Sequence, residues 1–199
     1  MRLHGVQVLM NDETTRRVDK TVELKTERLL LRPFRLEDVD GVFEYAADEE
    51  WARYMPTVPQ QYTRRDAEEF LAGAVLAPWE TNPIFAIVLD STVIGGISVR
   101  VDVQNETGEL GYAIGRPYWG QGLMPEAGTA VVDWAFEEFV LAKVHARADL
   151  RNVGSQHVME KLGMTREGVL RSHSKRRGKR VDYVYYGLLR EEWEEKAGS

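Results

Sequence analysis

The segment most suggestive of chemistry is Tyr118 to Leu123, which reads Tyr-Trp-Gly-Gln-Gly-Leu. It follows a run of residues typical of a β-strand and precedes a run with the apolar spacing of an amphipathic helix. Glycines at a strand-to-helix junction let backbone N–H groups approach an anion, and the N-terminus of the helix adds positive potential. The segment therefore predicts a diphosphate-binding loop, although a tight turn without a ligand has the same pattern.

Two common nucleotide-binding patterns do not fit this segment. The Gly-Lys-Ser/Thr ending of a phosphate-binding P-loop is missing, and Pro125 stands where the dinucleotide fingerprint has its last glycine. The chain has no cysteine, which removes thiol nucleophiles, disulfides and thiolate metal sites. Its four histidines show no ligand spacing such as HExxH, so we expect no metal site.

The composition indicates one folded domain with a small or local partner. The chain has 199 residues, of which 43% are hydrophobic and 29% charged, and a chain of this length buries a sizeable core. Its net charge of −6 disfavours a protein that binds nucleic acid over its whole surface. No stretch has the roughly 18 apolar residues of a membrane span, and residues 1–20 lack the apolar core of a signal peptide. We therefore expect a cytoplasmic protein.

The elements that would position the glycine-containing loop predict an α+β fold. Residues 1 to about 23 have no sustained period and are expected to form an arm or an extended start, followed by one domain over residues 24–195. Apolar periodicity predicts helices over 36–46, 63–77, 122–139 and 152–162. It predicts strands over 29–31, 84–89, 93–103, 109–114, 143–150, 165–171 and 181–189. The expected architecture is a central mixed, mostly antiparallel sheet flanked by about four helices.

Several ordered groups of residues, spanning about 26–193, share a recognisable pattern. They are Thr26 to Arg32, Glu109 to Tyr112, Tyr118 to Gly122 with Glu126 and Ala127, Asn152 with Ser155, Lys161 to Met164, and Glu167 with Gly168. Together they resemble the GCN5-related N-acetyltransferase superfamily, in particular its RimJ and RimL branch of ribosomal-protein N-terminal acetyltransferases. The resemblance implies a single domain of that type with acetyl-CoA as the acyl donor.

The resemblance also implies where acetyl-CoA binds. The pantetheine arm would run beside the strand that contains Tyr112, Ala113 and Ile114. Asn152 would contact the same arm, although Asn is also a common helix N-cap. The pyrophosphate would be held by the backbone of the loop Trp119, Gly120, Gln121, Gly122 and Leu123.

Two departures from the family pattern bear on the chemistry. Many members have Arg or Gln three residues before the first glycine of the loop, where this chain has Pro117. Many also carry a Tyr that protonates the departing thiolate, at a place that corresponds to Met159 here. The RimL-like alternative is a Ser on the same helix, which matches Ser155, so Ser155 is the candidate acid. The alternative for Ser155 is an ordinary residue in the first turn of a capped helix.

Glu109 is the first candidate for the general base. Period-2 alternation places it on the same face of its strand as Gly111 and Ala113. The alternative is a surface carboxylate at the edge of the sheet. An α-amino group with a pKa of about 8 is about one-tenth neutral at pH 7, whereas a lysine amine is neutral in well under one part in a thousand. An N-terminal acceptor therefore needs less help from a base.

The run from Arg171 to Arg180 has six basic and no acidic residues and is expected to form the tip of the last hairpin. It is either a solvated hairpin end or a gate that contacts ribosomal RNA or an acidic acceptor, and Asp182 could pair with it. Four aromatic residues could line an acceptor cleft or belong to the core instead: Trp51, Tyr54, Trp79 and Tyr118.

These expectations describe an enzyme that moves the acetyl group of acetyl-CoA directly to a primary amine. A protein N-terminal α-amine is the first choice of acceptor. One alternative acceptor is a small amine such as a polyamine, an antibiotic or an amino acid. A different alternative is a CoA-binding sensor or adaptor without catalysis. Expected partners are therefore acetyl-CoA and the amine acceptor, with a ribosome contact and a homodimer as further hypotheses.

Overall fold

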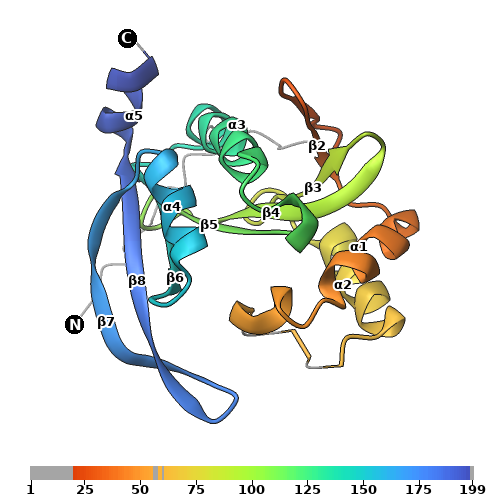
Figure 1. Cartoon of the computed structure of the whole chain (residues 1–199). Coiled ribbons are helices and arrows are strands. Elements are labelled where there is room, and N and C mark those ends of the chain that lie inside the picture. The colour runs from red at the N-terminus through yellow and green to blue at the C-terminus, as the bar shows by residue number, and fades with distance from the viewer. Residues whose placement is uncertain (1–19, 56–57, 60, 198–199) are drawn as a thin grey trace, which may run out of the picture.

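The computed structural model describes residues 20–55, 58–59 and 61–197. Within these ranges the chain forms one sheet with helices on both faces (Figure 1). Residues 1–19 of the expected arm lie outside the described residues. In the described part of the chain no helix is long and apolar enough to cross a membrane.

The sheet has eight strands in the order β1-β2-β3-β4-β5-β6-β8-β7. The strands are β1 (Leu24–Lys25), β2 (Leu30–Pro33), β3 (Ile84–Leu89), β4 (Thr92–Asp102), β5 (Thr107–Ile114), β6 (Lys143–Asp149), β7 (Thr165–Arg176) and β8 (Lys179–Leu189). Neighbouring strands are antiparallel except for β5 and β6, which are parallel. The expected mixed, mostly antiparallel sheet is therefore confirmed.

In the described residues, four α-helices and three short 3₁₀ turns lie between these strands, and a fifth helix, α5, follows the last strand. They are η1 (Leu36–Asp38), α1 (Val39–Ala46), η2 (Trp51–Tyr54), α2 (Arg64–Leu76), η3 (Arg116–Tyr118), α3 (Leu123–Glu138), α4 (Val153–Lys161) and α5 (Arg190–Ala197). Thr63 caps α2 through the capping box with Asp66, as its sequence predicts. The helix α5 is not predicted by the apolar pattern, because its short sequence is mostly charged.

Alternating side chains of the sheet pack into two separate cores. Leu110 and Ile114 of β5 belong to the core that contains the buried faces of α3 and α4, and Tyr112 packs against it. Ala113 packs against the other core, which contains residues of α1 and α2. The period-2 alternation of β5 is therefore confirmed, and Glu109 shares its parity with Ala113.

The strands β5 and β6 pair over only a few residues and then separate. The paired residues are Thr107 with Lys143, Gly108 with Val144 and Glu109 with His145. Beyond them β5 continues to pair with β4, and β6 continues to pair with β8. An opening through the sheet therefore begins directly after Glu109, with the rest of β5 on one side and the end of β6 on the other.

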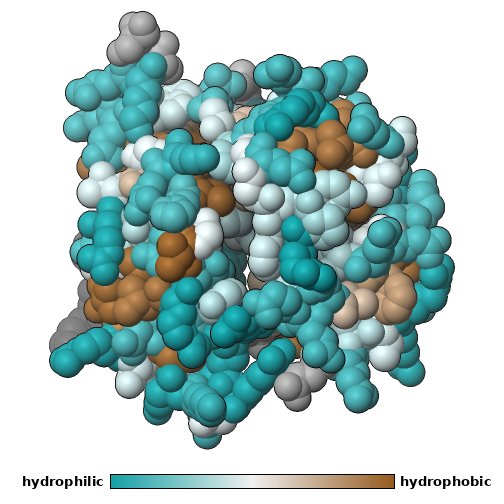
Figure 2. All heavy atoms as spheres, in the orientation of Figure 1, coloured by the Kyte–Doolittle hydropathy of each residue, from teal (hydrophilic) through white to brown (hydrophobic). Residues whose placement is uncertain are grey.

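The last hairpin is longer than its sequence predicts. The strands β7 and β8 pair as far as Arg176 with Lys179, so the tip is the two-residue turn Arg177 and Gly178 rather than the whole basic run. Both turn residues have positive φ, +45° and +78°, which matches the twist of a tight hairpin. Backbone pairing continues through charged residues because their side chains point away from the hydrogen-bond ladder. The end of this hairpin is covered by hydrophilic side chains (Figure 2).

Candidate active site

The loop between β5 and α3 has the conformation that its glycines predict. Gly120 and Gly122 have φ values of +73° and +78°, in the left-handed region that other residues adopt rarely. Gly122 is the N-cap of α3 and brings no side chain to the helix N-terminus. The Trp119 indole donates a hydrogen bond to the Ile114 carbonyl oxygen at 2.8 Å and fastens the loop to the end of β5. Two residues without side chains therefore stand at the N-terminus of α3, where backbone N–H groups can bind an anion.

Arg28 lies against this loop. Its Nη1 donates to the Gln121 carbonyl oxygen at 3.1 Å, and its Nε donates to Glu126 Oε2 at 2.7 Å. Glu126 Oε1 also accepts hydrogen bonds from the Arg28 backbone N–H and the Thr26 hydroxyl. Burial raises the pKa of Glu126, but the bonds from Thr26 and Arg28 lower it more, so the carboxyl titrates below its ordinary range. The Arg28 guanidinium, held by the ionised Glu126 carboxylate, thus lies at the edge of the proposed phosphate site.

The sequence pattern contained Arg28 and Glu126 but gave no role to either. They are 98 residues apart, and nothing in local periodicity brings the start of β2 to the first turn of α3. By contrast, Arg116, the cation nearest the missing loop Arg or Gln, points elsewhere. Its Nε donates to Asp48 Oδ2 at 2.6 Å. The hydrogen bond from the Trp51 backbone N–H, together with the one from Arg116, keeps the pKa of Asp48 below its ordinary value.

Ser155 is held on both sides at the start of α4. Its backbone N–H donates to Asn152 Oδ1 at 3.2 Å, so Asn152 is the N-cap of this helix. Its Oγ lies 2.8 Å from the Tyr112 hydroxyl, which also reaches the Ser155 carbonyl oxygen at 3.0 Å. Burial raises the pKa of Tyr112 to about 12, with the bond to Ser155 opposing the shift. Tyr112 is therefore a neutral phenol at physiological pH.

Met159 stands where the family pattern has a Tyr that protonates the departing thiolate. Its side chain has no exposed surface and belongs to the core. Its thioether carries no proton to donate. Ser155 and Tyr112, in contrast, bring two hydroxyl groups together at the start of α4, and either can donate a proton.

Glu109 is engaged by two arginines. Arg100 Nη2 donates to its Oε2 at 2.6 Å, and Arg147 Nε donates to its Oε1 at 2.9 Å. Burial raises the pKa of Glu109, but the charges of Arg147 and Arg100 lower it more, so the net shift is downward. A carboxylate in this setting stays ionised but is a weak base. Arg100 was accessible to sequence reasoning, because it faces Glu109 directly in the β4–β5 register.

The two candidate catalytic groups approach the opening from opposite faces of the sheet. Ser155 is reached by Tyr112, which points towards the core of α3 and α4. Glu109 has the opposite parity on β5 and bonds across the other face to Arg147 of β6. An acyl group held between β5 and β6 would therefore have a hydroxyl donor on one face and a carboxylate on the other.

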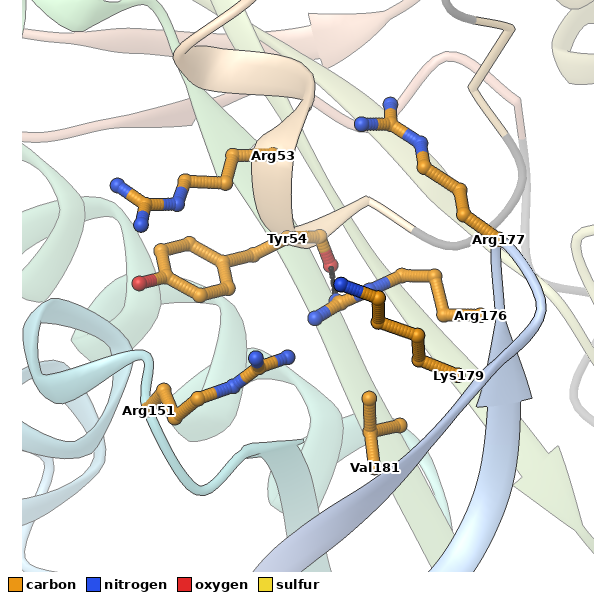
Figure 3. A pocket seen from close by; sticks show the side chains of 7 residues that line it. All are labelled: Arg53, Tyr54, Arg151, Arg176, Arg177, Lys179 and Val181. Carbon is orange, nitrogen blue, oxygen red and sulfur yellow. Dashed lines mark hydrogen bonds between the residues drawn. The ribbon is translucent and has the colours of Figure 1, made fainter.

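Of the four aromatic residues for which a cleft and a core position were both open, two belong to the core. Trp51 and Trp79 are buried in the cores, where large apolar rings contribute most by leaving water. Tyr118 is half-buried and packs against the first core. Tyr54 instead lines a cavity of about 230 Å³, whose other lining side chains are mostly cationic (Figure 3).

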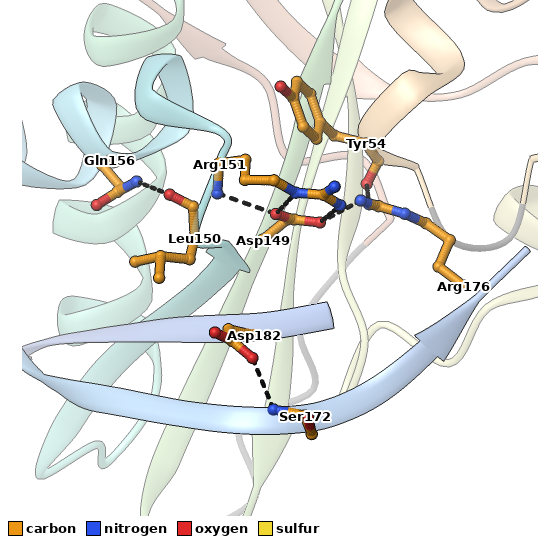
Figure 4. Close-up of polar contacts among 8 residues, drawn as sticks. All are labelled: Tyr54, Asp149, Leu150, Arg151, Gln156, Ser172, Arg176 and Asp182. Carbon is orange, nitrogen blue, oxygen red and sulfur yellow. Dashed lines mark hydrogen bonds and ion pairs between the residues drawn. The ribbon is translucent and has the colours of Figure 1, made fainter. Parts of the chain in front are cut away.

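The basic run is not a uniformly solvated hairpin end. The Arg176 side chain is only 8% exposed, pairs with Asp149, and donates from Nη1 to the Tyr54 carbonyl oxygen at 3.0 Å (Figure 4). Asp182 does not form an ion pair within the described ranges; its carboxylate accepts a hydrogen bond from the Ser172 backbone N–H at 2.7 Å. Antiparallel pairing turns Arg176 inwards, where Asp149 compensates its charge.

Comparison with known proteins gives a consistent result. The family model described as an acetyltransferase (GNAT) domain matches residues 28–165. The uncharacterized N-acetyltransferase p20 of Bacillus licheniformis is 31% identical over 175 residues, 85% of this chain and 97% of that protein. YdaF of Bacillus subtilis, provisionally named a ribosomal N-acetyltransferase, is 35% identical over 109 residues, 54% of this chain and 60% of its own. The solved structure of RimL, a ribosomal-protein α-N-acetyltransferase in complex with coenzyme A, has a TM-score of 0.79 at 15% identity and covers 86% of this chain and 99% of its own.

Proposed function

The chain belongs to the GNAT family of acetyl-CoA-dependent N-acetyltransferases, and we propose that its acceptor is the N-terminal α-amine of a protein. The observation that carries this proposal is the pair of arginines on Glu109, which lowers the pKa of the carboxyl. A weak base suits an α-amine, of which about one-tenth is neutral at pH 7. It does not suit a lysine or polyamine nitrogen, which holds its proton far more tightly.

We place acetyl-CoA along the opening between β5 and β6. The backbone of the loop from Trp119 to Leu123 would hold the pyrophosphate, with Arg28 beside it. The free edge of β5 at Tyr112, Ala113 and Ile114 would bond the pantetheine arm as a further strand would. Asn152, besides capping α4, would contact the same arm. This arrangement puts the thioester near Ser155.

In this arrangement each candidate residue has a separate task. Glu109 would orient the acceptor amine and take its proton, directly or through water, as the nitrogen attacks the carbonyl carbon. Ser155 would donate a proton or a hydrogen bond to the departing sulfur. A thiolate with a pKa near 8.5 needs only modest help, so water can complete the proton transfer. The absence of cysteine from the sequence agrees with direct transfer.

YdaF, which matches half of this chain, supports a ribosomal or other protein acceptor of the RimJ and RimL kind. The exposed cations of the run from Arg171 to Arg180 are the surface that we propose for contact with a ribosomal particle or its RNA. A cytoplasmic location and a homodimer belong to the same proposal. Polyamines are poorer candidates, because cationic side chains line the cavity beside Tyr54 and repel them.

The experiment that tests the proposed function compares three acceptors with the purified full chain and acetyl-CoA. They are peptides with a free N-terminus and no lysine, the same peptides with a blocked N-terminus and one lysine, and spermidine. Thiol release would measure turnover, and mass spectrometry would locate the acetyl group. We expect acetylation of the free N-terminus; faster transfer to lysine or spermidine would refute the α-amine proposal.

A further inference from the structure

The cavity beside Tyr54 is built by three segments that are distant in the sequence. It has a volume of about 230 Å³ and lies between η2, the junction of β6 and α4, and the β7–β8 hairpin (Figure 3). Its lining residues are Arg53, Tyr54, Arg151, Arg176, Arg177, Lys179 and Val181. Five of these seven side chains are cationic, and none is acidic.

The positive charge of this cavity is only partly compensated. Asp149 pairs with Arg151 and Arg176, and Glu50 pairs with Arg53. Among the ion pairs of the described residues, none involves Arg177 or Lys179. Several like charges that line one hollow raise its electrostatic potential and concentrate anions there.

The hairpin is fixed in the place that forms the cavity. Arg176 joins the buried carboxylate of Asp149 on β6 to the carbonyl oxygen of Tyr54 on η2 (Figure 4). Its guanidinium also lies 5.6 Å from the centre of the Tyr54 ring, within the range of a cation–π contact. The side chains of Asp149 and Arg176 are 1% and 8% exposed. Such a buried pair is costly to desolvate and holds its partners in one geometry.

The cavity adjoins the proposed site of acetyl transfer. Arg151 directly precedes Asn152, the N-cap of the helix that carries Ser155. The Arg151 guanidinium meets Asp149 through both Nε and Nη2, at 2.9 and 2.8 Å, which fixes this junction. Gln156 of α4 also bonds back to the Leu150 carbonyl oxygen at 2.9 Å. The cavity therefore lies directly beside the start of the helix that carries Ser155.

We propose that this cavity binds a carboxylate of the acceptor, supplied by an Asp or Glu side chain close to the N-terminal amine of a peptide. The proposal rests on the proposed function and adds the acceptor's sequence preference. The two N–H groups on one side of a guanidinium match the two oxygens of a carboxylate. Arg177 and Lys179 form no ion pair among the described residues and can therefore bind a carboxylate from the acceptor.

Within the cavity itself, the surroundings favour a single carboxylate over an RNA strand that would continue into the neighbouring hollow. A second hollow of about 210 Å³ is lined by Glu49, Glu50, Ala52, Arg53 and Arg177. A sugar-phosphate backbone that continued from the cationic cavity would meet these two carboxylates and be repelled. An acidic side chain on a short peptide ends inside the cavity and avoids them.

The test uses the full chain, acetyl-CoA and short peptides of one neutral sequence with a free N-terminus. The second, third or fourth residue is changed in turn to Glu or to its neutral isostere Gln. We expect kcat/KM for one Glu peptide to exceed that of its Gln partner by about tenfold, the factor of one charge-assisted hydrogen bond. Equal kcat/KM values for every pair would overturn the inference.

A matched pair of double variants separates the cavity from the general charge of the hairpin. Arg177→Asn with Lys179→Gln removes two cavity charges, and Asn tolerates the positive φ of position 177. Lys175→Gln with Arg180→Gln removes two charges from the same hairpin that do not line the cavity. We expect the Glu preference to disappear in the first variant and persist in the second. Equal loss in both would show charge attraction alone and overturn the inference.

Binding of the N-acetylated peptides, measured by calorimetry with coenzyme A present, reports on the cavity without transfer. If no free peptide is acetylated but the acetylated Glu peptide still binds through Arg177 and Lys179, the cavity is upheld and the α-amine acceptor is refuted. If peptides are acetylated without preference, the proposed function stands and the cavity is refuted. A phosphoserine peptide preferred over Glu, or a single-stranded RNA that displaces the Glu peptide, would replace the carboxylate by phosphate.

Discussion

The Tyr112 hydroxyl on β5 lies 2.8 Å from the Ser155 Oγ on α4, across the start of the opening through the sheet. The phenol has one proton and two acceptors within reach, the Ser155 Oγ and the Ser155 carbonyl oxygen. When it donates to the Oγ, the serine proton is free to point at a departing sulfur. When it donates to the carbonyl, the serine hydroxyl can donate back to Tyr112. The pair therefore has two arrangements. In the first the serine proton is available for catalysis, and in the second it is used in the hydrogen bond to Tyr112.

Replacement of Ser155 tests the acid. We expect Ser155→Ala to lower kcat by about ten- to a hundredfold and to leave the Kd of acetyl-CoA nearly unchanged, because the hydroxyl acts mainly in the transition state. Tyr112→Phe should have a smaller effect on kcat, since water can replace its hydrogen bond. Unchanged turnover of Ser155→Ala, measured where chemistry limits the rate, would leave Ser155 only its place in the first turn of α4.

Replacement of Gly122 tests the loop. Acetyl-CoA at a hundredfold excess over Kd should stabilise the fold by about 2.7 kcal/mol, read as a rise in Tm. Gly122→Val should abolish this rise, because φ is +78°, where a β-branched residue is strained, and the new side chain would stand beside Arg28 at the proposed diphosphate site. Gly73→Val on exposed α2, where a Cβ meets no atom within 4 Å, is the control and should keep it. A Gly122→Val protein with the full rise would place acetyl-CoA elsewhere.

Arg28 offers an independent test of the same site. Arg28→Gln removes the charge at the loop and the bond to the Gln121 carbonyl oxygen. We expect a rise of several-fold in the Kd of coenzyme A by calorimetry, because a cation at a diphosphate is worth a charge-assisted hydrogen bond. Arg65→Gln on α2, which loses an exposed pair with Glu69, is a suitable control. An unaltered Kd for Arg28→Gln would restrict Arg28 to fastening Glu126.

Asp149 predicts a loss of stability in acid. Burial raises its pKa, but the bonds from Arg151 and the charge of Arg176 lower it more, so the folded-state pKa is below that of the unfolded chain. The unfolded state then takes up the proton first, and stability present above about pH 4 is lost as the pH falls through the folded pKa. Asp149→Asn should cost about 3 kcal/mol at pH 7, by leaving Arg176 buried without its charge partner.

Urea unfolding of the wild type and of Asp149→Asn between pH 7 and pH 3 measures both effects. The variant should be less stable at neutral pH and should lose less on acidification. The two curves therefore converge in acid. Parallel curves would mean that Asp149 does not titrate with folding.

The exposed cations of the hairpin predict salt-dependent binding to a ribosomal particle. Arg176 is left unchanged, because it is a buried part of the fold. Neutralising Lys175, Arg177, Lys179 and Arg180 should raise the KM of a ribosomal acceptor and flatten its dependence on ionic strength. The kcat on a short neutral peptide should not change. A salt slope that stays the same after removal of all four charges would end this hypothesis.

The sequence predicted the features that depend on local physics. The positive φ at Gly122 follows from a glycine between a strand and a helix, and the Thr63 cap follows from Asp66 three residues later. The parity of Glu109 follows from alternation along β5. These need only neighbouring residues, which is why a single sequence carries them.

Features that depend on register or on distant pairs were not predictable in the same way. Arg147 meets Glu109 only because β5 and β6 are parallel in one register, and Arg28 meets Glu126 across 98 residues. Arg176 was grouped with the exposed cations, because no local sequence pattern predicts its buried ion pair with Asp149. Runs of charged residues are usually exposed to solvent, but tertiary packing buries a member of such a run where a buried residue of opposite charge pairs with it.

The separation of β5 from β6 also has a consequence for the order of events in a catalytic cycle. Ser155 and Glu109 reach the opening from opposite faces, so the two substrates would enter from opposite faces as well. Acetyl-CoA and the acceptor can then be bound at the same time, because neither blocks the entry of the other. No product has to leave before the second substrate binds. Double-reciprocal plots of the initial rate against acceptor concentration, at several fixed concentrations of acetyl-CoA, should therefore give lines that intersect rather than run parallel. Each product should inhibit on its own, without the other product being present.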